Sequence, residues 1–118
     1  MVLTMQSAET LVSAAIAYVE LRSALAAAMR EGRIALAERE RIVLEIEQLW
    51  QGVSEIPMER PLLRHAGDLA DRMSLRGYDA VHLAAVLQCG APGEVALACW
   101  DTELRRAARD LGYSLIPS

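Results

Sequence analysis

The chain has 118 residues, of which 53% are hydrophobic and 24% are charged, a composition that excludes a disordered protein. Its 12 basic residues are all arginine, and 16 acidic residues give a net charge of −4, which disfavours nucleic-acid binding through bulk positive charge. No apolar run reaches the roughly 18 residues of a membrane span. The length predicts a single domain over residues 1–118. The two cysteines are interpreted as buried thiols, as expected of a cytoplasmic protein.

The predicted elements alternate between short apolar strands and helices. Strands are expected at 10–13, 53–57, 95–100 and 113–117, and helices at 14–30, 37–51, 59–73, 78–89 and 102–111. Ser13 is predicted to cap the first helix and Gly32 to end it. Short apolar strands separated by helices favour a parallel sheet in a layered α/β domain.

Most acidic residues lie among other charges, as expected of a solvated helix face, but Glu20 does not. Its helical neighbours at three and four residues are Ile16, Ala17, Ser23 and Ala24, so no cation covers it on that face. The sequence leaves two interpretations: an exposed glutamate at the helix edge, or a carboxylate that faces a functional cavity.

Asp79 and Asp101 also lie outside charged company. Asp79 opens the almost wholly apolar helix 78–89, and Asp101 directly follows the strand 95–100. Each is open to interpretation as a helix cap, a role that does not exclude ligand binding. Ligands of open parallel sheets bind beyond the carboxyl ends of strands, and carboxylate oxygens suit Mg²⁺ or Mn²⁺. We therefore hypothesise that Glu20, Asp79 and Asp101 converge on one metal site.

Three stretches, in this order, resemble the VapC-type toxins of the PIN-domain family. They are SAAIAYVELRSAL at 13–25, LRGYDAVHLAA at 75–85 and ACWDTEL at 98–104, and the resemblance extends over about 11–117. It implies a three-layer α/β fold with a central parallel sheet flanked by helices. It also implies that Glu20, Asp79 and Asp101 are catalytic ligands of Mg²⁺ or Mn²⁺.

The same resemblance implies a function. VapC toxins cleave single-stranded RNA by metal-activated water, usually form homodimers and are inhibited by a VapB antitoxin. Arg76 is placed to approach an RNA phosphate, and Thr102 either to hydrogen-bond a metal-bound water or to cap the following helix. Two other hypotheses stay open: a catalytically inactive PIN-like protein acting through protein–protein interaction, and a helical interaction module without a parallel sheet.

The N-terminus departs from the family pattern. PIN domains begin with a central strand that ends in an aspartate ligand, whereas this sequence has no aspartate before Asp68. The first strand is therefore expected to be missing or replaced, which would leave unpaired strand edges in the middle of the sheet. We predict that residues 2–5 fill this position, or that a second copy donates a segment by domain swapping.

The aromatic residues are predicted to serve packing rather than base stacking. This expectation applies to Tyr18 and Tyr78 and, as core residues, to Trp50 and Trp100.

Overall fold

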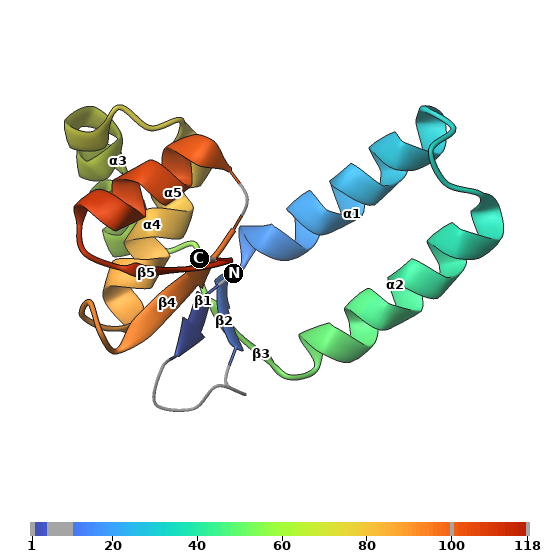
Figure 1. The fold of residues 1–118 in the computed structure, drawn as a ribbon, viewed down its shortest axis with the longest axis horizontal. Helices are drawn as coiled ribbons and strands as arrows, with labels where there is room; N and C mark the ends of the chain where they lie inside the picture. Colours follow the sequence, from blue (N-terminus) through green and yellow to red (C-terminus); the bar gives the residue numbers. More distant parts are fainter. Residues whose placement is uncertain (1, 5–10, 100, 118) are drawn as a thin grey trace. The chain divides into compact units, whose positions relative to one another are not determined.

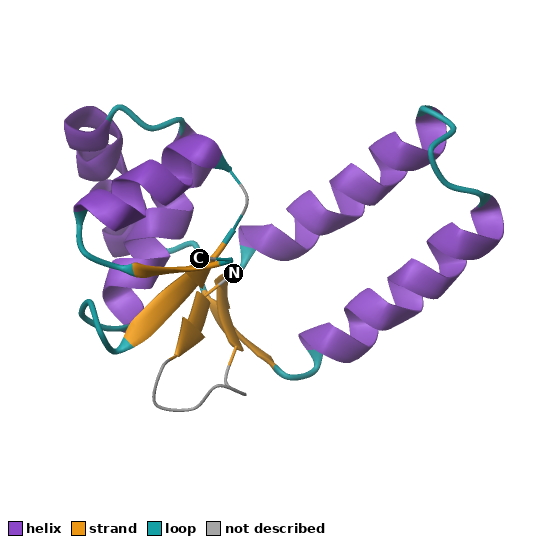
Figure 2. Cartoon of the chain, in the orientation of Figure 1, coloured by secondary structure: helices purple, strands orange, loops and turns teal. Residues whose placement is uncertain are grey.

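The computed structural model describes residues 2–4, 11–99 and 101–117. The helices are α1 (Ile16–Arg30), α2 (Leu36–Trp50), α3 (Arg60–Met73), α4 (Gly77–Cys89) and α5 (Thr102–Asp110). The strands are β1 (Val2–Thr4), β2 (Leu11–Ala14), β3 (Val53–Ile56), β4 (Val95–Ala98) and β5 (Ser114–Ile116). These bounds follow the predicted alternation of strands and helices, which Figure 2 shows by colour.

The strands form one sheet in the order β3-β2-β1-β4-β5. Strand β1 lies between β2 and β4 and runs antiparallel to both, whereas β4 and β5 are parallel (Figure 1). The Cα partners of β1 are Val12 and Leu97 for Val2, Leu11 and Ala96 for Leu3, and Val95 for Thr4. The sheet is therefore mixed, where the sequence led us to expect parallel strands.

The position of β1 confirms that the N-terminal segment fills the centre of the sheet. Val2–Thr4 lies within the predicted segment 2–5, of which residue 5 is outside the described residues. An antiparallel strand satisfies the backbone hydrogen-bonding groups of both neighbours as fully as a parallel strand does. A segment that runs in the opposite direction can therefore act as the central strand. The sheet described here is continuous without a segment from a second copy.

Helix α4 supplies the core of the part of the chain that contains the sheet. It packs against β1, β2 and β4 and between α3 and α5. Its side chains at Ala80, Leu83, Ala84 and Val86 are completely buried, as the nearly uncharged sequence of this helix predicts. The start of α4 is thereby held firmly against the sheet.

Residues Ile16–Val53, which contain α1 and α2, form a compact unit of their own. In this helical hairpin, the ring of Tyr18 meets the edge of Trp50 at a centroid distance of 5.6 Å. The Tyr18 hydroxyl donates a hydrogen bond to Glu47 and accepts one from Arg22 at 2.9 Å. Tyr18 therefore packs between the two helices, as predicted.

Of the local predictions, the one for Gly32 is confirmed, and those for Ser13 and Tyr78 are wrong. Gly32 has a φ of 72°, a conformation that favours glycine, and ends α1 as expected. Ser13 is not a helix cap, because it lies in β2, is fully buried and donates to the carbonyl of Ala14. Tyr78 does not pack, since it is 61% exposed, and Trp100 lies outside the described residues.

The described residues contain no helix that is long and apolar enough to cross a membrane. Cys89 and Cys99 are free and half-buried, so the two thiols do not form a disulfide.

Candidate functional site

Asp79 lies in the first turn of α4, but it is not the helix cap. The N-cap is Arg76, and Asp79 follows three residues later, where a carboxylate still favours the positive end of the helix dipole. Its side chain is only 15% exposed. The oxygen Oδ2 is buried without a hydrogen-bond partner among the described residues, which is unusual for a carboxylate.

Asp101 follows β4 and caps α5, which confirms the capping interpretation of this residue. Its Oδ1 accepts a hydrogen bond of 2.9 Å from the backbone N–H of Leu104. Because Asp101 is the cap, Thr102 is the first residue of the helix, and the alternative of a Thr102 cap is wrong. The second oxygen of Asp101, Oδ2, takes no part in the cap and accepts a hydrogen bond from Arg76.

Arg76 joins the two aspartates. Its Nη2 lies 3.2 Å from Oδ2 of Asp101, and its Nε lies 3.5 Å from Oδ2 of Asp79. Two carboxylates that are 22 positions apart in the sequence thus meet at one guanidinium group. Arg76 thus brings Asp79, in the first turn of α4, and Asp101, after β4, to one place in the fold.

The electrostatics of the pair show a shortage of positive charge. Burial raises the pKa of Asp79, and the neighbouring charge of Asp101 raises it further. The Arg76 guanidinium and, to a smaller extent, His82 act in the opposite direction, without cancelling the rise in the pKa. A cation between the two carboxylates would relieve this repulsion.

Glu20 belongs to α1, in the helical hairpin. Its convergence with Asp79 and Asp101 therefore stays a prediction. Within the described part of the chain, no group of three or more His, Cys, Asp or Glu side chains is arranged to hold a metal ion. The site consists of a pair of carboxylates to which a third ligand is proposed.

The aspartate pair fits a hard divalent cation. It provides carboxylate oxygens, of which one is buried and lacks a hydrogen-bond donor, as expected of an atom prepared for a cation. The nearby thiol of Cys99 is a poor candidate, because burial raises its pKa and a protonated thiol does not bind a metal.

Sequence reasoning named Arg76 as an RNA contact but missed its bridging role, and it missed Arg105 altogether. The bridging role of Arg76 has a partial signal, since an arginine three positions before Asp79 is within reach on a helix start. Arg105 has none: it donates to the carbonyls of Cys99 at 2.9 Å and Pro117 at 2.7 Å. It thereby ties together the segments that follow β4 and β5, next to Asp101.

Comparison with known proteins identifies the relatives of this fold. The family model of the PIN domain matches residues 3–110, which is most of the chain and includes Glu20, Asp79 and Asp101. The chain belongs to the PIN-domain family. The resemblance found in the three sequence stretches is confirmed, as is the α/β fold class, and the hypothesis of a helical module without a parallel sheet is wrong.

Similarity to two curated relatives shows that this PIN-domain protein is of the VapC type. It is 40% identical over 111 residues to Ribonuclease VapC45 and to Ribonuclease VapC49 of Mycobacterium tuberculosis, strains CDC 1551 / Oshkosh and H37Rv respectively. Each alignment covers 90% of this chain and 73% of the relative. No solved structure matches the chain significantly.

Proposed function

We propose that this protein is the ribonuclease toxin of a toxin–antitoxin pair and cleaves single-stranded RNA with Mg²⁺ or Mn²⁺. Similarity to two VapC ribonucleases supports the reaction class. The observation that carries the proposal is the convergence of Asp79 and Asp101 on one point, with a buried oxygen that lacks a hydrogen bond.

The proposed ligands are Asp79, Asp101 and Glu20. Asp79 supplies a buried oxygen and Asp101 its Oδ2, while Oδ1 of Asp101 stays bonded to the α5 backbone. Glu20 is assigned from the family resemblance, with α1 as the element that carries it. When bound, the ion would activate a water and stabilise negative charge on the phosphoryl group.

Arg76 and Thr102 are proposed to contact the RNA. The Arg76 side chain is 79% exposed, so its guanidinium has room to approach a backbone phosphate. Thr102 is exposed at the start of α5, beside Asp101, where its hydroxyl is accessible to a water or a phosphate. These local donors and the ion would supply the positive charge that the acidic chain lacks overall.

A second candidate is a PIN-like protein without nuclease activity that acts through protein–protein interaction. The observation that favours it is β1, whose sequence Val-Leu-Thr fills the centre of the sheet without contributing a carboxylate. The family pattern has an aspartate on its central strand, so this site would hold its ion with fewer ligands.

Protein partners are proposed for either function. Helices α1 and α2 expose large apolar side chains at Val19, Leu36, Leu44 and Leu49, the kind of surface that a second copy or an antitoxin covers. We propose a homodimer and a VapB-like antitoxin, in the cytoplasm, where two free thiols remain reduced.

The test is cleavage of single-stranded RNA by the full chain, with and without Mg²⁺ or Mn²⁺. Asp79→Asn is expected to abolish cleavage, at least a hundredfold, because it removes a ligand charge. Asp101→Asn should do the same and retain the cap of α5, since asparagine caps helices well. Asp71→Asn, on the exposed face of α3, is the matched control and should cleave normally.

Metal-dependent cleavage that survives Asp79→Asn would contradict the proposed site. Absence of cleavage by the unchanged protein, combined with binding to its antitoxin, would favour the second candidate.

A further inference from the structure

Arg76 makes contacts that neither a helix cap nor an RNA-binding role requires. Its guanidinium lies 3.2 Å from Asp101 and 3.5 Å from Asp79, through different nitrogens and on the Oδ2 atom of each carboxylate. For Asp101 this is the oxygen that the cap of α5 leaves unused, and for Asp79 it is the buried oxygen that makes no hydrogen bond. The positive charge of Arg76 therefore lies against the atoms proposed to bind the ion.

The main chain of Arg76 is fixed, whereas its side chain is not. Its carbonyl accepts a 2.9 Å hydrogen bond from the N–H of Ala80, the first turn of α4, and Ala80 is completely buried. The side chain, in contrast, is 79% exposed, and exposed ion pairs are weak. The guanidinium can thus leave the aspartates at small cost while its attachment point stays in place.

We propose that Arg76 is a tethered cation that occupies the aspartate pair in the metal-free protein and is displaced when a divalent ion binds. This inference rests on the proposed metal site. A guanidinium and a metal ion at the same two oxygens would repel each other, so the two cations compete for the aspartate pair. Arg76 therefore lowers the affinity for the ion and stabilises the metal-free pair, and on displacement it becomes available to a phosphate.

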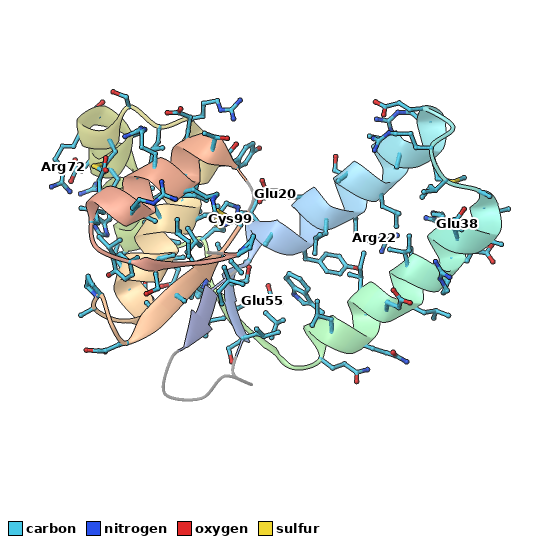
Figure 3. All side chains as sticks on the ribbon, in the orientation of Figure 1. Glu20, Arg22, Glu38, Glu55, Arg72 and Cys99 are labelled. Carbon is cyan, nitrogen blue, oxygen red and sulfur yellow. The ribbon has the colours of Figure 1, made fainter. Side chains whose placement is uncertain are left out.

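The test is Mn²⁺ binding to the full chain without RNA, followed through the electron paramagnetic resonance signal of free Mn²⁺. Arg76→Gln, which removes the charge of the side chain and keeps a polar amide, should bind Mn²⁺ about three- to tenfold more tightly, the range that two weak ion pairs provide together. Arg72→Gln is the matched control: it removes the same charge at the end of α3 (Figure 3), and its affinity should equal that of the unchanged protein.

A second measurement uses the unchanged protein and so does not depend on the folding of a variant. The Nε–H resonance of Arg76, assigned through its side chain, should shift when diamagnetic Mg²⁺ is added, whereas that of Arg72 should not. A purely structural arginine would keep its resonance.

The outcomes separate this inference from the proposed function. Equal or weaker Mn²⁺ binding by Arg76→Gln, with binding lost in Asp79→Asn, overturns the role of Arg76 and leaves the metal site standing. No Mn²⁺ binding by any of these proteins overturns both. Tighter binding by Arg76→Gln, but not by Arg72→Gln, together with the shift of the Arg76 resonance, supports the competition.

Discussion

Asp79 shows how a residue suited to a metal ion is poorly suited to the metal-free fold. Its carboxylate is largely buried, its Oδ2 lacks a hydrogen bond, and its pKa is raised first by burial and then by Asp101. A raised carboxyl pKa means that the folded protein holds the proton more tightly than the unfolded chain does. Ionisation at neutral pH therefore costs folding free energy.

Asp79→Asn is accordingly expected to stabilise the metal-free protein. With a chelator at pH 7, its free energy of unfolding should rise by at most about 1 kcal/mol, since the substitution also removes the ion pair with Arg76. Saturating Mn²⁺ should reverse the order, because only the unchanged protein gains binding energy. Thermal unfolding under both conditions measures this, and a less stable Asp79→Asn in chelator would contradict the interpretation.

Tyr113 offers a pH-dependent test that is independent of the metal site. Its side chain is buried and its hydroxyl donates a 2.6 Å hydrogen bond to the carbonyl of Gly90. Burial, followed by the charges of Glu94 and Cys89, raises the pKa of the phenol above its usual value of about 10. The stabilisation of the folded protein by the protonated Tyr113 phenol is therefore complete below pH 10, and it is lost as the pH rises through the pKa of the folded state.

Tyr113→Phe should lower the free energy of unfolding by about 1 kcal/mol at pH 7, because the buried carbonyl of Gly90 loses its donor. The difference between the two proteins should shrink above pH 10. Denaturant unfolding from pH 7 to 11 measures it, and the absence of lysine keeps this range free of other basic side chains. A difference that stays constant with pH would contradict the assignment.

At the level of elements, the three-residue strand β1 is decisive, because it is the central strand of the sheet. Val2–Thr4 pairs with β2 on one side and β4 on the other, so it connects the two halves of the sheet. It runs antiparallel to both neighbours and pairs with each of them. Its three residues, Val-Leu-Thr, include no acidic side chain. The element thus completes the sheet without contributing a carboxylate.

Leu3→Pro tests the central position of β1. Proline removes a backbone donor and does not fit between two paired strands, so the free energy of unfolding should fall by about 3 kcal/mol or more. Leu36→Pro is the matched control, because the first position of α2 tolerates proline. Equal stability of the two variants, measured by denaturant unfolding, would show that Val2–Thr4 is not a central strand.

For the whole molecule, the main feature is its division into two compact units. The helical hairpin Ile16–Val53 carries the proposed ligand Glu20, and the remainder of the chain carries Asp79 and Asp101. Few described side chains are buried in the hairpin, three in α1 and one in α2, whereas α4 in the other unit buries six of its 13 residues.

Hydrogen exchange should report this difference. Backbone amides of α1 and α2 are expected to exchange at least tenfold faster than those of α4, because fewer buried apolar contacts oppose their opening. Mass spectrometry of peptides from the free protein measures the rates. Equal protection of the hairpin and α4 would contradict the expectation, and slower exchange of α1 and α2 on dimer or antitoxin binding would locate the partner.

The amino-acid sequence alone was sufficient to predict the helices, two of the candidate site residues and the family of this protein. Helix bounds agree with the structure within about two residues, because glycines, caps and apolar spacing act locally. Asp79 stood out at the start of a nearly uncharged helix, and Asp101 stood out because it directly follows an apolar strand, where ligands of open sheets bind. Both patterns are local in the sequence. The family was recognisable for the same reason, since three local stretches carry its pattern.

Other features depend on contacts between distant parts of the chain. Three residues carry no signal for strand direction, so the antiparallel orientation of β1 follows from its pairing with β2 and β4. Arg76 and Asp101 are 25 residues apart and meet because α4 and β4 pack together. Such contacts arise when the core forms around α4, because burial of apolar surface there fixes which charges become neighbours.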